Sequence, residues 1–340
     1  MVRMLTEIAE SRAIIARAKI LPAQELHLRR QALIRMTHAS TAIEGNMLNL
    51  DQVEALYRRK KIDAPARDIY EARNYLNALR YITQVVEEKR GIGEKTILKI
   101  HRLATAKTLP EEQSGHYRKG MVYVVRRRLG FSDEIIYTAA APEKVPQLTT
   151  DLIDWMKAPQ TQEINPVIVA GIVHQEIAAI HPFADGNGRT ARAAATLVLY
   201  QRGYDFRKLF ALEDYYNNDR AEYYKAINIG KNYENRRADF TPWLEYFIKG
   251  FKKEIDNTKA QITLLAHRKI DKKIASQIYL TPEQLKIIDF MEQMGKITAK
   301  DIMDILSVPK RTAQLHLQKL KNLKMIAQTS KGPASAYILK

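Results

Sequence analysis

One short segment of the chain, residues 181–192, carries side chains that suit proton transfer and metal binding. The imidazole of His181 has an ordinary pKa of about 6.5, so at neutral pH it can accept a proton from an attacking hydroxyl. Asp185 offers one hard carboxylate, and Mg²⁺ is usually held by one or two carboxylates together with substrate phosphates. These two residues favour chemistry on a phosphate ester.

The same segment predicts a binding site for phosphate. The run Gly186, Asn187 and Gly188 can turn tightly and expose backbone N–H groups to an anion. A helix is expected over residues 187–200, so the anion would lie at its N-terminus, where orphan donors and the helix dipole favour negative charge. Arg189 and Arg192, three residues apart, share one face of that helix and can pair with phosphates.

Each fragment has a simpler interpretation when it is taken alone. A Gly-Asn-Gly run is more often an ordinary turn, and a histidine beside a proline is more often a satisfied buried residue. All of these parts occur together within twelve consecutive residues. We therefore interpret the segment as a site for phosphate-ester chemistry on a nucleotide.

The segment resembles the signature of the Fic family, His-Pro-Phe-x-(Asp/Glu)-Gly-Asn-Gly-Arg-x-x-Arg, and matches it at every specified position. Most members of that family move AMP from ATP onto a hydroxyl side chain of a target protein. The resemblance implies that His181 deprotonates a Ser, Thr or Tyr of the target, while Asp185 holds Mg²⁺ between the α- and β-phosphates. It also implies that the glycine-rich turn cradles the phosphates and that Arg189 and Arg192 pair with the β- and γ-phosphates.

A second motif, Ser40-Thr-Ala-Ile-Glu44-Gly45, lies far upstream. It resembles the inhibitory element of the same family, Ser/Thr-x-x-x-Glu-Gly/Asn, and implies that Glu44 pairs with Arg192 and removes the partner of the γ-phosphate. The alternative is a helix end at which Gly45 is the stop and Glu44 is a solvated charge. Because the motif precedes the signature, the chain resembles the subclass with an N-terminal inhibitory helix.

Two further features fit an enzyme that holds a protein substrate. Residues 121–125 and 135–138 are β-rich runs on either side of a turn-like stretch, which predicts a hairpin. In Fic proteins a hairpin flap at this place pairs with the target by strand addition, although an ordinary surface hairpin is the alternative. Tyr223 and Tyr224 could line the adenine pocket by the family pattern, or be half-buried packing residues.

Composition indicates a cytoplasmic, mainly helical protein. The 340 residues are 46% hydrophobic and include no cysteine, which excludes disulfides, thiolate metal sites and cysteine nucleophiles. The N-terminus has charges where a signal peptide needs an apolar run, and no segment approaches the ~18 apolar residues of a membrane span. We expect a cytosolic location and no membrane partner.

Apolar spacing of three and four residues predicts helices over 23–41, 50–60, 67–89, 95–107, 149–156 and 165–180. Another begins near Phe240, and a charged connecting helix is expected from Phe251 to Ile278. The predicted fold is a mainly α, Fic-type helical core with a β-hairpin flap and a small C-terminal domain. The expected divisions are an N-terminal helical region with the inhibitory helix (1–60), the catalytic core (61–250), a linker helix (251–278) and a last domain (279–340).

The last domain resembles a winged helix-turn-helix. Helices are predicted at 282–293, 298–306 and 309–322, followed by strands at 325–329 and 336–339. The net charge of +17 suits an anionic partner such as DNA. On the presumed recognition helix and wing, the candidate DNA contacts are Arg311, Thr312, Gln314, Gln318 and Lys331. Winged helices also dock proteins, so a protein partner remains an alternative.

Two classes of function stay open at this point. The first is a protein adenylyltransferase that uses ATP and Mg²⁺ and is restrained by Glu44, with itself as one possible target. The second is a DNA-binding transcriptional regulator whose core is a nucleotide sensor or a self-modifying switch. Transfer of another phosphate-containing group, removal of AMP from a modified target, and formation of a homodimer are also compatible with the residues.

Overall fold

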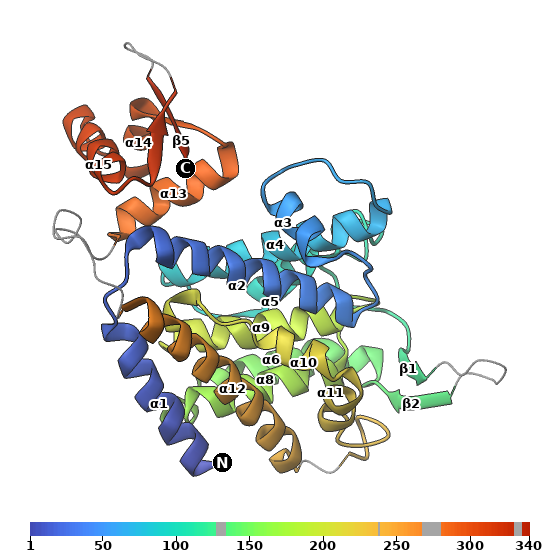
Figure 1. Ribbon diagram of the computed structural model, residues 1–340. Helices are drawn as coiled ribbons and strands as arrows, with labels where there is room; N and C mark the ends of the chain where they lie inside the picture. The colour runs from blue at the N-terminus through green and yellow to red at the C-terminus, as the bar shows by residue number, and fades with distance from the viewer. Residues whose placement is uncertain (127–133, 237–238, 267–279, 330–334) are drawn as a thin grey trace. The chain divides into compact units, whose positions relative to one another are not determined.

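A computed structural model describes residues 1–126, 134–236, 239–266, 280–329 and 335–340 (Figure 1). The chain divides into two compact units. The first contains Met1–Ala16 and Gln31–Thr258, and the second contains Arg17–Arg30 and Lys259–Lys340. Helix α2, Pro22–Ile43, contributes residues to both units.

The first unit is built almost entirely of helices. Besides the later part of α2, they are α1 Val2–Arg17, α3 Leu50–Tyr57, α4 Ala66–Glu87, α5 Glu94–Thr105, α6 Val145–Lys157, α7 Pro159–Glu163, α8 Pro166–Ile180, α9 Asn187–Gln201, α10 Leu212–Asn218, α11 Arg220–Ile227 and the greater part of α12 Thr241–Ala266. Two short 3₁₀ helices cover Pro142–Lys144 and Phe206–Lys208.

Helices α8 and α9 pack against each other and form the centre of this unit. Helix α8 has apolar residues on all sides, as a buried helix should, and α9 is buried along nearly its whole length. Gly171 of α8 lets α12 come close, because a Cβ there would lie 2.8 Å from Leu244 Cδ2. The indole nitrogen of Trp243 donates to the Gly171 carbonyl at 2.7 Å. The close packing of α8 against α12 therefore holds the end of α8 in place, where the segment that begins at residue 181 follows.

A two-stranded antiparallel hairpin lies at the edge of the helices (Figure 1). Its strands are β1, Tyr123–Arg126, and β2, Glu134–Thr138. The backbone N–H of Thr138 donates to the Lys231 carbonyl at 3.0 Å, which ties β2 to the segment after α11. The hairpin is thus attached to the helices at its base.

Among the described residues, the second unit contains the first part of α2, the last part of α12 and the helices α13 Pro282–Met294, α14 Ala299–Leu306 and α15 Lys310–Asn322. Its three-stranded sheet has the order β3-β5-β4, with β3 Ile297–Thr298, β4 Ile326–Gln328 and β5 Ala336–Leu339. Capping boxes at Thr281 and Thr298 begin α13 and α14. The core includes Ile287, Ile302 and Leu317, and Leu26 packs against it.

The predicted mainly helical fold is confirmed, and the expected elements of the first unit lie within a few residues of the observed ones. Helices α1, α7 and α10 and strand β3 are not among the predictions. The expected connecting helix is the continuation of α12 as far as Ala266, and the remainder of its range lies outside the described residues. Residues 127–133, in the predicted turn, and residues 330–334, in the predicted wing, lie outside the described residues as well.

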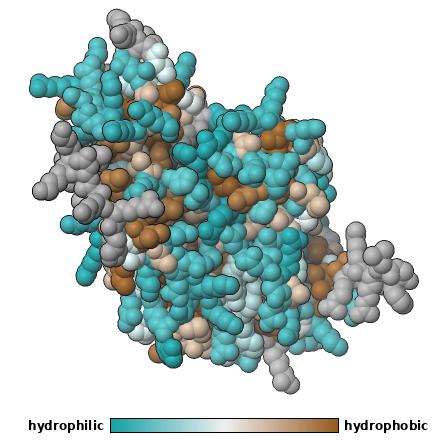
Figure 2. Space-filling model, in the orientation of Figure 1, coloured by the Kyte–Doolittle hydropathy of each residue, from teal (hydrophilic) through white to brown (hydrophobic). Residues whose placement is uncertain are grey.

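No described helix is both long enough and apolar enough to cross a membrane. In the view of Figure 2, hydrophilic residues cover most of the surface and hydrophobic residues are scattered between them. The large apolar side chains that are exposed include Met47, Tyr123, Ile135 and Leu315.

Candidate active site

Helix α8 ends in a backbone conformation that presents the predicted base. His181 is the C-cap residue and has φ 54° and ψ 59°, in the left-handed region that non-glycine residues rarely adopt. Its Nδ1 lies 3.0 Å from the Ala178 carbonyl oxygen. Since a carbonyl only accepts, Nδ1 carries the proton and Nε2 keeps a free lone pair. Burial lowers the pKa of His181 below its ordinary value, so the ring is neutral at pH 7.

Arg118 fixes the end of α8, a role that the sequence did not assign to it. Its Nε donates to the His181 carbonyl at 2.7 Å and its Nη1 donates to the Gly120 carbonyl at 2.7 Å. Its Nη2 donates to the Ala140 carbonyl. One buried guanidinium thus joins the base residue to the chain on both sides of the hairpin.

The loop between α8 and α9 is closed by Asn187. The amide of this side chain accepts from the Phe183 N–H at 2.9 Å and donates to the Phe183 carbonyl at 2.8 Å. Gly186, the residue before Asn187, has φ 77° and is the N-cap of α9. The first N–H groups of α9 have no partner within the helix, so the loop directs donors at any anion in front of it.

His101 of α5 supports the same loop and was not predicted. Its Nδ1 accepts from the Gly115 N–H at 2.9 Å, so the protonated Nε2 donates to the Asp185 carbonyl at 2.9 Å. Its ring stacks on Phe183 with centroids 3.7 Å apart and planes 5° apart. Burial lowers the pKa of His101 to about 4, which keeps this tautomer at neutral pH. The one feature of the sequence that could have indicated this role is that a polar residue, His101, lies on the buried face of α5.

Replacing Gly186 by alanine is expected to destabilise the first unit by about 2–3 kcal/mol, because strain at positive φ adds to crowding. An added Cβ would lie 2.6 Å from Thr105 Cγ2. Gly45 is the matched control, since it has φ 95° but open space around it. Urea unfolding should show that Gly45→Ala lowers the free energy of unfolding by about 1 kcal/mol. Equal losses in the two variants would contradict the crowding argument.

The surroundings of Asp185 suit its predicted role as a metal ligand. Its Oδ1 accepts from the Gly186 N–H at 2.6 Å, while its Oδ2 lies 3.7 Å from guanidinium nitrogens of Arg67 and Arg189. The side chain is 45% exposed. The described residues contain no cluster of three or more His, Asp or Glu able to hold a metal. One open carboxylate beside an anion-binding loop suits Mg²⁺ that arrives with phosphates.

The two arginines of α9 lie in different surroundings. Arg189 is 1% exposed, and its Nη1 lies 3.4 Å from the Ala104 carbonyl and 3.9 Å from Glu71 Oε1. Arg192 is 2% exposed and is directed at α2. Both side chains are therefore preordered within the protein.

Glu44 and Arg192 form an ion pair, as the upstream motif predicts. Arg192 Nη2 lies 2.6 Å from Glu44 Oε1, and it also donates to the Ser40 carbonyl at 2.9 Å. Arg192 Nε donates to Ser40 Oγ at 2.8 Å. Burial acts to lower the pKa of Arg192, but the charge and hydrogen bond of Glu44 together with Tyr223 and Tyr75 outweigh it, so the net shift of the pKa is upward.

Glu44 also lies against the glycine-rich turn. A Cβ added to Gly188 would overlap Glu44 Oε1. Helix α2 ends at Ile43, and Gly45 follows Glu44 with φ 95°. The carboxylate thus occupies space beside the backbone where a phosphate is expected.

The two predicted tyrosines differ in exposure. Tyr223 is 2% exposed, with its hydroxyl 3.0 Å from His174 Nε2 and 3.5 Å from Arg192 Nη1. Tyr224 is 45% exposed and donates to the Ile43 carbonyl at 3.2 Å. Both lie near the Glu44 turn, and their part in binding adenine stays a prediction.

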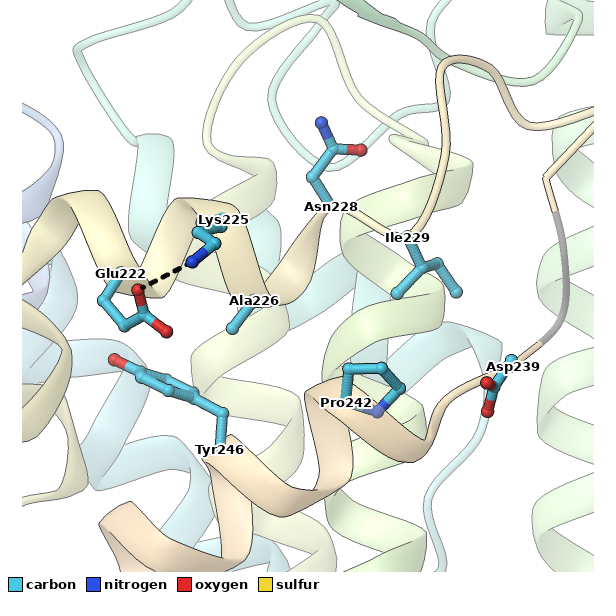
Figure 3. Close-up of a pocket in the computed structure, with 8 residues that line it drawn as sticks. All are labelled: Glu222, Lys225, Ala226, Asn228, Ile229, Asp239, Pro242 and Tyr246. Atoms are coloured by element: carbon cyan, nitrogen blue, oxygen red, sulfur yellow. Dashed lines mark ion pairs between the residues drawn. The ribbon is translucent and has the colours of Figure 1, made fainter.

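A hollow of about 390 Å³ lies between α11 and α12. In Figure 3, Tyr246 and Pro242 of α12 face Glu222 and Ala226 of α11. None of its lining residues is a predicted site residue.

In the second unit, α15 buries Ala313, Leu317 and Leu320. Of the candidate DNA contacts, Arg311, Gln314 and Gln318 are exposed and Thr312 is half-buried. Lys331 lies outside the described residues. The helix therefore has one apolar face and one polar face.

Comparisons with known proteins agree with this arrangement. Residues 91–199 match the model of the Fic/DOC family, and the chain carries a Fic domain. It is 29% identical over 225 residues to protein adenylyltransferase fic-1 of Caenorhabditis briggsae, covering 65% of this chain and 40% of that protein. It is 28% identical over 251 residues to protein adenylyltransferase Fic of Nematostella vectensis, covering 72% and 53%. The chain thus spans about half or less of the length of these relatives.

A solved structure extends the likeness beyond the Fic domain. A Fic family protein from Desulfovibrio desulfuricans is 26% identical, with a TM-score of 0.63, and the match covers all of this chain and 95% of that one. Fic-1 from Caenorhabditis elegans is 25% identical with a TM-score of 0.63, over 77% of this chain and 72% of that one.

Proposed function

We propose that the protein is an adenylyltransferase that transfers AMP from ATP to a hydroxyl side chain of a target protein. The observation that carries this proposal is the neutral His181 with a free Nε2 beside an anion-binding loop and Asp185. The names of the relatives support the same reaction. A target could include a second copy of this chain.

In the proposed reaction, Nε2 of His181 takes the proton of the target hydroxyl. The hydroxyl oxygen attacks the α-phosphorus, a phosphate ester bond forms, and pyrophosphate leaves. Mg²⁺ held by Asp185 would neutralise charge on the phosphates. Positioning and charge stabilisation suffice for this chemistry, so no covalent enzyme nucleophile is required.

The hairpin is the proposed docking strand for the target. In the described part of the chain, β1 pairs only with β2, which leaves one edge of the hairpin for strand addition. Tyr123 and Val125 of β1 are 49% and 41% exposed. Such pairing aligns a target backbone without requiring one sequence.

Glu44 is the proposed inhibitor of this activity. Its ion pair with Arg192 occupies the arginine that would otherwise meet the γ-phosphate. A charge-assisted hydrogen bond contributes roughly 1.5–3 kcal/mol, which changes the competent population by about tenfold to a hundredfold.

The test of the reaction is a labelling assay with Mg²⁺, the purified chain and a cell lysate. ATP labelled on the α-phosphate should label protein, whereas ATP labelled on the γ-phosphate should not. Label from both would indicate phosphate transfer, and label from neither, despite nucleotide binding, would reject ATP as the donor.

A second proposed function is DNA binding by a winged helix in the second unit. The exposed polar face of α15 supports it, since that face carries Arg311, Gln314 and Gln318. In the regulator alternative, this unit reads DNA while the Fic domain senses nucleotide. Operator binding that is unaffected by His181→Ala would favour the regulator.

Lys319→Ala is expected to lower the slope of log affinity against log salt by about one unit, because each phosphate contact releases about one counterion. Lys319 is an exposed residue of α15. Fluorescence anisotropy on a labelled duplex measures the slope. Lys60→Ala, at an exposed position in the first unit, is the control and should leave it unchanged. An affinity indifferent to salt would exclude DNA binding of this kind.

A further inference from the structure

Two buried hydrogen bonds connect Arg192 to Ser40 and Tyr75 to a second carboxylate, Glu213. Arg192 Nε donates to Ser40 Oγ at 2.8 Å. The hydroxyl of Tyr75 donates to Glu213 Oε1 at 3.0 Å. Ser40, Arg192 and Glu213 all act on the pKa of Tyr75, so the two bonds belong to one buried electrostatic network.

All four residues of this network are withdrawn from solvent. Ser40 and Tyr75 are 0% exposed, Glu213 is 1% exposed and Arg192 is 2% exposed. A buried charge that lacks an opposite charge strongly destabilises a protein. Glu44, whose side chain is 31% exposed, is the more accessible of the two carboxylates linked to Arg192.

Glu213 titrates close to neutral pH. Burial raises its pKa to about 7, against the opposing effects of backbone and Tyr75 hydrogen bonds and of the Arg192 charge. Its Oε2 has no hydrogen-bond partner among the residues that the structure describes. The titratable and charged groups that interact with Glu213 come from α4, α9, α10 and α11, and they are Tyr75, Arg192, Asp214, Tyr216 and Tyr223.

We propose that Glu213 is a positioning residue and a second counter-ion of Arg192, which holds the buried guanidinium in place beside Ser40 and Tyr75 when Glu44 withdraws. The withdrawal itself rests on the proposed function, in which nucleotide phosphate displaces Glu44. With both carboxylates present, loss of either one leaves Arg192 compensated. When both carboxylates are absent, the guanidinium of Arg192 is a buried charge without an opposite charge.

A double-mutant cycle tests this inference without a catalytic readout. The variants are Glu44→Gly, Glu213→Gln and the pair together, and the measurement is the urea midpoint of the full chain at pH 8, where Glu213 is ionised. The double variant should lose at least about 0.5 M more than the sum of the single losses. Additive losses would overturn the inference.

The matched control is Glu176→Gln in place of Glu213→Gln. Glu176 is a half-buried acid whose pKa burial also raises, but it pairs with Arg236 at 2.5 Å. The loss in urea midpoint from Glu176→Gln and the loss from Glu44→Gly should sum, with no excess loss in the double variant. Tyr75→Phe, which removes only the hydroxyl, should show a smaller excess loss of the same sign.

The pH dependence separates a charge effect from a packing effect. At pH 6 Glu213 is mostly neutral, so the excess loss should shrink, whereas a packing defect would give the same excess at both values. The double-mutant cycle measures stability and not activity. A negative AMP-transfer assay would therefore reject the proposed function without changing the conclusion drawn from the cycle.

Discussion

The variant His181→Ala should transfer AMP about 10²–10⁴ times more slowly than the wild type, which is the usual contribution of general base catalysis. The reason is that Nδ1–H donates to the Ala178 carbonyl, so Nε2 keeps a free lone pair that can accept the proton. Initial rates of labelling from α-labelled ATP measure the loss. ATP affinity should change little, because the imidazole acts on the target hydroxyl.

His27→Ala is the control for that variant, since His27 is an exposed histidine outside the site. The pH profile adds a second check. Burial lowers the folded pKa of His181, so the wild-type rate should stay level as the pH falls to about 6.5 and should fall only below the folded pKa. A rate that already halves above pH 7, or a variant as fast as wild type, would remove His181 from the role of base.

Glu44→Gly should raise the transfer rate by about tenfold to a hundredfold, because it frees Arg192 for the γ-phosphate. Arg192 keeps its bonds to Ser40, so its position should survive the change. The measurement is the initial rate at a fixed ATP concentration, together with the ATP dissociation constant.

Glu88→Gly is the matched control for Glu44→Gly. Glu88 is also a glutamate at the C-terminal end of a helix, the C-cap of α4, but its partner is Arg90 at 2.6 Å on the surface. Its replacement should leave the rate unchanged. A similar increase in both variants would point to a general loosening of the chain, and no increase in either would exclude Glu44 as an inhibitor.

The sequence predicted those parts of the site that lie within one short segment. The signature residues are consecutive, and a glycine-rich turn before a helix has few possible geometries. His101 and Arg118 could not be found this way, because their partners are 84 and 63 residues away and their importance depends on packing. The Glu44–Arg192 pair, 148 residues apart, was accessible only through the resemblance of its motif.

The helices were predictable for a related reason, since apolar periodicity is a local property. Tyr223 shows the limit of local reasoning. Its spacing on a helix does not reveal that its hydroxyl reaches both His174 and Arg192, because α8 and α9 supply those contacts. Glu213 was likewise invisible in sequence, as an acid in the first turn of a helix is ordinarily solvated.

The position of Glu44 beyond the last residue of α2 has a kinetic consequence. The turn is held by backbone bonds from Glu44 to Thr41 and from Gly45 to Ala42, each of 3.0 Å. Segments at helix ends rearrange in nanoseconds to microseconds, whereas enzymes turn over in milliseconds to seconds. The proposed inhibition would therefore be a rapid equilibrium within every catalytic cycle, and progress curves of the wild type should begin without a lag.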